Sequence, residues 1–144
     1  MMLEELQQLK PLITLGKTDE ALLLIDELEE MGKEEKINKI HHYCVLLLIH
    51  LIKQSVENHV DHSLEVSIRN AIAAINRTNR RLKTGNTYLA KEQVMEILIE
   101  AYDQALDNAS LEAFGGIYDA IALGMGKMID RDSILDHALQ LILA

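Results

Sequence analysis

The feature that most constrains the fold is a run of apolar residues at 37–52. These residues recur every three or four positions, which is the period of an α-helix and not of a strand. Ile37, Ile40, Cys44, Leu47, Leu48 and Leu51 form a stripe, Val45, Ile49 and Ile52 widen it, and Lys39, His42, His50 and Lys53, with Leu46, leave a thin polar strip. A helix that is apolar nearly all round is covered by neighbours. This segment is therefore predicted to be the centre of a helical bundle.

The composition favours helices throughout the chain. Its 144 residues include one proline, one phenylalanine, four tyrosines and no tryptophan, while 49% are hydrophobic. Few strand formers and this length are typical of one helical domain. We expect an all-α, up-and-down bundle of five to seven helices in a single domain over 1–144. Residues 114–144 are expected to be a C-terminal helical extension packed on the same core.

Apolar spacing and capping residues predict where the helices begin and end. Pro11 disturbs the first helix, and Thr18 and Gly32 can cap and close the second. Ser133, with Asp136 three residues later, resembles a capping box that opens the last helix. The predicted helices are approximately 2–10, 18–31, 34–57, 63–83, 88–113, 117–128 and 133–143. Gly85 and Asn86 mark a turn before the fifth of these.

Charge and cysteine content exclude several classes of protein. The net charge of −9 argues against a general nucleic-acid or anionic-membrane binder. A single cysteine, Cys44, forms no internal disulfide, and its apolar surroundings predict a buried, inert thiol. The first ten residues are acidic where a signal peptide is basic. The longest near-apolar stretch, 43–52, is far shorter than the roughly 20 residues of a membrane span. We expect a soluble, cytoplasmic protein with no membrane contact.

Five short sequence motifs follow one another in an order that resembles a known family. They are Leu-Glu-Glu-Met-Gly-Lys-Glu-Glu-Lys at 28–36, Val-Leu-Leu-Leu-Ile-His-Leu-Ile-Lys at 45–53, Ser-Leu-Glu-Val-Ser-Ile at 63–68, Thr-Tyr-Leu at 87–89 and Tyr-Asp-Gln-Ala at 102–105. Over 19–112 the chain resembles the mainly cyanobacterial family of domains of unknown function numbered twenty-nine. Leu64 stands where that family has tryptophan, a proline-containing segment is absent, and the last 30 residues have no counterpart.

The resemblance implies an all-helical fold and no assigned activity. It marks His50 and Lys53 as motif positions of unknown role. The two residues are three apart on the polar strip, two turns after His42, so they can act as a proton-transfer or anion-binding pair. The alternative is a histidine at the rim of a helix interface, hydrogen-bonded to a neighbour.

Two further groups of residues carry possible chemistry. His59, Asp61 and His62, with Glu57, have side chains that bind divalent metals, although a solvated connector has the same composition. Arg131 and His137 form an Arg-x5-His pair that resembles a motif of helical nucleases found with nucleotidyltransferases. Such an enzyme uses the pair near the 2′-hydroxyl and the scissile phosphate of RNA.

Opposite charges gather on two of the predicted helices. Arg69, Arg77, Arg80, Arg81 and Lys83 lie opposite the apolar stripe of 63–83, and Glu92, Glu96, Glu100, Asp103 and Asp107 share one side of 88–113. They are either solvated faces or a docking surface for a protein partner or a second copy of the chain. The acidic residues Asp26, Glu27, Glu29 and Glu30 can neutralise part of the basic face. The last helix, with Ile134, Leu135, Leu139 and Ile142, is expected to supply apolar contact area.

The leading interpretation is a non-enzymatic protein-interaction module or complex subunit that needs no cofactor. One alternative is a nuclease-like or toxin–antitoxin-associated protein that uses Arg131 and His137. The other is a helical bundle that binds a divalent metal through His59, Asp61 and His62.

Overall fold

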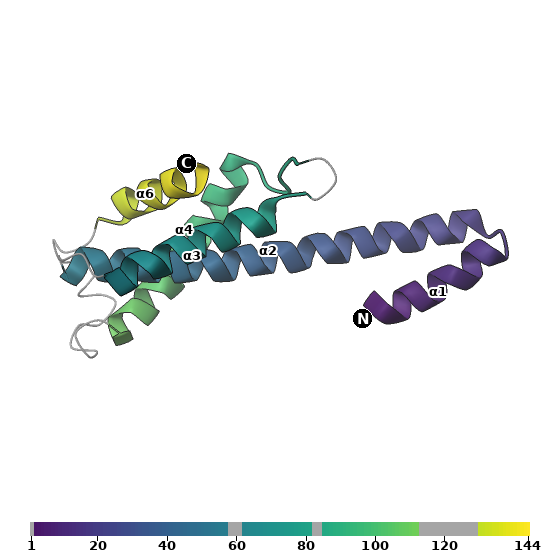
Figure 1. Cartoon of the computed structure of the whole chain (residues 1–144), viewed down its shortest axis with the longest axis horizontal. Coiled ribbons are helices and arrows are strands. Elements are labelled where there is room, and N and C mark those ends of the chain that lie inside the picture. Colours follow the sequence, from purple (N-terminus) through teal and green to yellow (C-terminus); the bar gives the residue numbers. More distant parts are fainter. Residues whose placement is uncertain (1, 58–61, 82–84, 113–129) are drawn as a thin grey trace. The chain divides into compact units, whose positions relative to one another are not determined.

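The chain is all-α, as its sequence predicts. The computed structural model describes residues 2–57, 62–81, 85–112 and 130–144, and 89% of them are helical. The helices are α1 (Met2–Thr14), α2 (Thr18–Glu57), α3 (His62–Asn79), α4 (Lys91–Glu112) and α6 (Arg131–Leu143) (Figure 1). Over these ranges there is no strand, only an isolated antiparallel bridge between Arg80 and Thr87. The helix predicted at 117–128 lies outside the described residues.

The chain divides into two compact units, and the division falls inside α2. The first unit is Met1–Asn38 and the second is Lys39–Ala144. The first contains α1 and the beginning of α2, which we call the N-terminal hairpin. The second contains the rest of α2 together with α3, α4 and α6. Each unit is described by itself below.

Pro11 does not end the first helix, contrary to the prediction. The helix continues for three residues to Thr14, and the Pro11 carbonyl accepts a hydrogen bond from the Leu15 amide at 2.9 Å. Proline has a helix-compatible φ, although it lacks the amide that would bond to the Gln7 carbonyl and its ring crowds that carbonyl. Because this part of α1 is exposed, water can solvate that carbonyl.

A tight turn joins α1 to α2 in the hairpin. The Lys17 amide donates to the Leu12 carbonyl at 2.9 Å, and the Gly16 amide donates to the Ile13 carbonyl at 3.1 Å. This is the Schellman pattern, which needs a left-handed residue, and Gly16 supplies it with φ = 72°. The Lys17 carbonyl then accepts from Ala21, so that α2 starts at once. Figure 1 shows α1 returning along the first part of α2.

Gly32 does not break α2, so the prediction of two helices at 18–31 and 34–57 is wrong. The two segments form one helix of 40 residues. Glycine costs a helix about 1 kcal/mol relative to alanine, but Met31, Lys33 and Glu34 beside it are good helix formers. Gly32 also lacks the positive φ that Gly16 and Gly85 adopt. One unfavourable residue without a proline nearby is therefore too little to end the helix.

The core of the second unit is built around α2, as predicted. In α2, the residues Ile40, Cys44, Val45, Leu47, Leu48, Ile49, Leu51 and Ile52 are buried. α6 packs against α4 and α3. In doing so it buries Ile134, Leu135 and Ile142 inside the molecule. Three of the four residues expected to supply contact area to a partner are thus buried internally, while Leu139 is half-buried.

The loop between α3 and α4 is longer than predicted, because α3 ends early and α4 starts late. α3 stops at Asn79, not at residue 83, because the Asn79 carbonyl accepts from the Tyr88 amide at 2.8 Å. The buried Asn79 side chain accepts from the Leu89 amide at 2.8 Å and donates to the Leu89 carbonyl at 3.3 Å. Gly85, with φ = 73°, makes the turn between these segments. α4 then starts after Ala90, whose amide donates to the Gln93 side chain.

The last helix is capped by Asp130, not by Ser133. The Asp130 carboxylate accepts from the Ser133 amide at 3.4 Å, and its carbonyl accepts from Ile134 at 3.0 Å. Aspartate and serine are both good caps, and the helix starts at the earlier of the two. No helix in the described part of the chain is long and apolar enough to cross a membrane.

Candidate interaction site

The N-terminal hairpin exposes an unusual amount of apolar surface. Six of its large hydrophobic side chains are 38–69% exposed: Leu6, Ile13, Leu15, Leu22, Leu23 and Met31. Among the described residues of this unit, only Ala21 and Leu24 are buried hydrophobics. The helices therefore share little core, and Leu6, Leu15, Leu22 and Leu23 are exposed.

The same hairpin is strongly acidic. Its acidic residues are Glu4, Glu5, Asp19, Glu20, Asp26, Glu27, Glu29, Glu30, Glu34 and Glu35, against Lys10, Lys17, Lys33 and Lys36. Asp26, Glu27, Glu29 and Glu30 are all exposed, as are the neighbouring Leu22 and Leu23. The surface thus combines apolar side chains with a negative rim.

A hollow lies between α2 and α3 in the second unit, and we call it the α3 hollow. It has a volume of about 370 Å³ and is lined by Tyr43, Leu46, His50, Ser67, Asn70, Ala71, Ala74 and Arg77. Leu46, Ala71 and Ala74 form its apolar part. Its polar lining can donate hydrogen bonds, and none of these lining residues carries a carboxylate. The α3 hollow therefore suits an apolar side chain that has an anionic group next to it.

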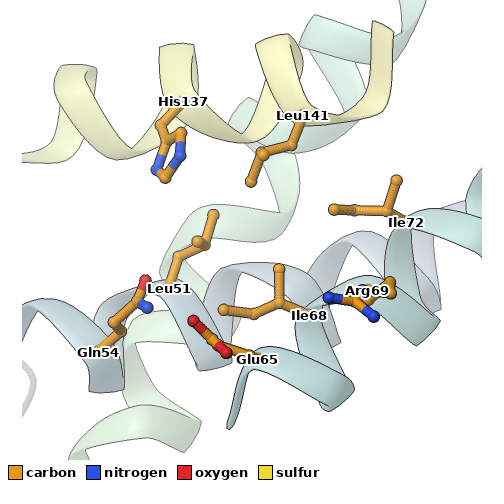
Figure 2. A pocket seen from close by; sticks show the side chains of 8 residues that line it. All are labelled: Leu51, Gln54, Glu65, Ile68, Arg69, Ile72, His137 and Leu141. Carbon is orange, nitrogen blue, oxygen red and sulfur yellow. The ribbon is translucent and has the colours of Figure 1, made fainter. Parts of the chain in front are cut away.

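A second groove, the α6 groove, lies on the other side of α3. It has a volume of about 310 Å³ between α2, α3 and α6 (Figure 2). Leu51, Ile68, Ile72 and Leu141 give it an apolar lining, and the polar residues around them are Gln54, Glu65, Arg69 and His137. Figure 2 shows the His137 ring pointing from α6 towards Leu51 and Gln54. This groove carries both signs of charge, in contrast to the α3 hollow.

The basic residues predicted to form a docking face are exposed on α3 and just after it. Arg69 lines the α6 groove and Arg77 lines the α3 hollow. The Arg81 guanidinium stacks on the Tyr88 ring at 4.8 Å from its centroid. Arg69, Arg77 and Arg80 make no ion pair with any carboxylate of the described residues. Lys83 lies outside the described part.

The acidic residues predicted to form the opposite face are also exposed. They are Glu92, Glu96, Glu100, Asp103 and Asp107 on α4. Their repeated spacing of three or four residues keeps them on one side of the helix. This side is distinct from the buried stripe of Val94, Leu98 and Ala101.

His50 and Lys53, the motif positions implied by the family resemblance, are both half-buried on α2. His50 lines the α3 hollow, three residues before Lys53 along the helix. His42 is exposed, and its ring lies 5.7 Å from that of Tyr43, measured between centroids. The role of His50 and Lys53 stays a prediction.

Arg131 and His137 point to different neighbours of α6. The Arg131 guanidinium lies 5.5 Å from the centroid of the Tyr102 ring on α4 and pairs with Asp132 at 3.3 Å. His137 lines the α6 groove against α2 and α3. Six residues along a helix correspond to about 9 Å of rise and about 120° of rotation. Burial raises the pKa of Tyr102, and the charge of Arg131 partly opposes that shift.

The residues proposed as metal ligands are only partly described. His59 and Asp61 lie outside the described residues, and His62 is exposed at the first position of α3. Over the described ranges, no three His, Cys, Asp or Glu side chains are grouped so that they could hold a metal. Cys44 is buried, and burial raises the pKa of its thiol to about 12. That thiol is therefore neutral and unreactive at physiological pH.

Sequence reasoning did not identify the α3 hollow, although the spacing contains a signal for it. Tyr43, Leu46 and His50 follow one another at three and four residues along α2. Ser67, Asn70, Ala74 and Arg77 do the same along α3. Each row predicts a common face of its helix. Only the structure shows that the two faces meet.

Comparisons with known proteins identify a family without an assigned function. A family model described as Domain of unknown function DUF29 matches residues 15–116, which is most of the chain. No curated protein and no solved structure matches the sequence. The match spans the motifs at 28–36, 45–53, 63–68, 87–89 and 102–105, and the C-terminal extension with α6 lies beyond it. The chain belongs to the DUF29 family.

Proposed function

We propose that this chain is a non-enzymatic interaction subunit that binds a protein partner through its N-terminal hairpin. The observation that carries the proposal is the exposure of six large apolar side chains on a unit with only two buried hydrophobics among its described residues. An accumulation of exposed large apolar side chains on a unit with so small a core favours a protein contact. A pair of helices also gains most of its stability from packing, and here a partner has to provide much of it.

The hairpin also limits the chemistry of its partner. Its apolar side chains require an apolar surface, and the exposed carboxylates beside them require basic groups around that surface. Exposed ion pairs contribute only about 0–1 kcal/mol each. The leucines therefore supply most of the binding energy, while the charges orient the partner and speed its association.

The test compares two full-length variants in extract of the native cell. The Leu22→Glu/Leu23→Glu variant places charge at two of the most exposed leucines of the hairpin, which are 54% and 66% exposed. Leu111→Glu introduces a charge at a leucine of α4 that is 74% exposed. On size exclusion, the wild type and Leu111→Glu are expected to elute in a complex heavier than 16.3 kDa, and the double variant as a monomer.

Circular dichroism of each purified variant controls for folding. If the folded double variant elutes in the same complex as the wild type, the hairpin is not the contact and the proposal fails.

A further inference from the structure

We infer that the partner of the hairpin is a second copy of this chain, which receives it along α3 and at the α3 hollow. The inference rests on the proposed function, because it identifies what the hairpin binds. The hairpin requires a partner surface that is apolar and has basic groups around it. The second unit of the same chain carries such a surface.

The α3 hollow and the arginines beside it match the hairpin in polarity and in charge. The half-buried Leu46 offers apolar contact in a hollow of about 370 Å³, and the buried Ala71 and Ala74 complete its apolar lining. Arg77 lines the same hollow, and Arg80, directly after the end of α3, is exposed. The hairpin presents exposed leucines beside exposed carboxylates. Each of the two surfaces thus supplies what the other lacks.

The arginines remain available for a contact with a second molecule. The chain has 23 acidic residues, yet Arg77 and Arg80 make no ion pair with a carboxylate of the described residues. The α6 groove is a poorer receptor for an acidic hairpin, because Glu65 lines it. A carboxylate there would repel the carboxylates of the incoming helix.

A pair of identical chains can satisfy both surfaces at once. In a dimer with two-fold symmetry, the hairpin of each copy lies on α3 of the other. Both sets of leucines are then buried, and no surface is left open to add a third copy. The arrangement predicts that dimerisation requires the leucines and weakens with salt.

The experiment is a charge exchange between two full-length variants, measured by sedimentation equilibrium. In one, Arg77→Glu/Arg80→Glu reverses the receptor face. In the other, Asp26→Lys/Glu30→Lys reverses the charge of two exposed hairpin residues. The wild type is expected to dimerise below about 100 μM, and each variant alone to dimerise at least roughly tenfold more weakly. An equimolar mixture restores a dimer, because both contacts then join opposite charges.

A matched control reverses two exposed carboxylates outside the proposed contact, with Glu96→Lys/Glu100→Lys on α4. It is expected to dimerise like the wild type. A wild type that stays monomeric at about 100 μM overturns the inference and leaves the hairpin with a different partner. A mixture that fails to dimerise, or a control that weakens as much as the receptor variant, also overturns the pairing. A dimer that survives Leu22→Glu/Leu23→Glu also overturns the inference, because the hairpin is then not its contact, and the proposed function is decided by the complex formed in cell extract.

Discussion

At the scale of single residues, Asn79 shows how one buried side chain can set the end of a helix. It is only 6% exposed, and both atoms of its amide are bonded to the backbone of Leu89. The sequence predicts instead that the helix continues to residue 83, since asparagine at this position has no helix-breaking signature of its own. The missing information is the location of Leu89, ten residues later, and spacing on one helix does not contain it.

Replacing Asn79 with alanine is expected to lower the free energy of unfolding by about 1–3 kcal/mol. The Leu89 amide would lose its acceptor while remaining buried, and an unsatisfied buried donor carries that cost. Asn70→Ala is the control, because the Asn70 side chain is exposed and makes no hydrogen bond with the described residues. Urea denaturation of the two variants measures the difference. Equal stabilities would mean that the pairing with Leu89 contributes nothing.

At the scale of helices, the type of element followed from the sequence and the boundaries did not. The stripe at 37–52 identified the central helix correctly because apolar period is a property of the segment itself. The helix ends predicted at Pro11 and Gly32 were wrong. Whether such a residue ends a helix depends on its own free-energy cost and on the helix propensity of its neighbours. Gly16 ends a helix and Gly32 does not, and the difference lies in backbone φ, which the residue name does not reveal.

The two glycines of the hairpin are therefore expected to respond oppositely to alanine. Gly32→Ala should raise stability by about 0.5–1 kcal/mol, because it favours a helix and a Cβ there meets no atom within 4 Å. Gly16→Ala should lower stability by about 1 kcal/mol, because alanine is strained at φ = 72°. Thermal melts followed by circular dichroism compare both variants with the wild type. Shifts of the same sign would contradict the assignment of Gly32 to the helix interior.

At the scale of the whole molecule, the sequence predicted the faces of the helices but not which faces meet. Ile134, Leu135 and Ile142 of α6 were expected to contact a partner, yet they are buried where α6 packs against α3 and α4. Burial depends on which neighbours a helix finds, and a single sequence does not specify them. For the same reason the α3 hollow appeared only in three dimensions.

The two units should differ in the rate at which their amides exchange with solvent. Few buried apolar contacts hold α1, while 40–52 runs through the core of the second unit. In dilute protein, below the dimerisation range, the amides of α1 are expected to exchange orders of magnitude faster than those of 40–52. Hydrogen exchange read by mass spectrometry measures both. Equal protection in monomeric protein would show that the hairpin is stable on its own.

Because Cys44 is buried, its reaction with a thiol reagent reports the opening of the core of the second unit. The thiol is 0% exposed and is the single cysteine of the chain. A thiol reagent can reach it only when the helices around it separate, and burial also keeps it protonated, with a pKa of about 12. The rate at which Cys44 is alkylated in the native protein therefore measures how often the second unit opens, and no added label is needed. Partner binding that stabilises this unit would lower that rate, and intact-mass spectrometry would measure the alkylated fraction over time.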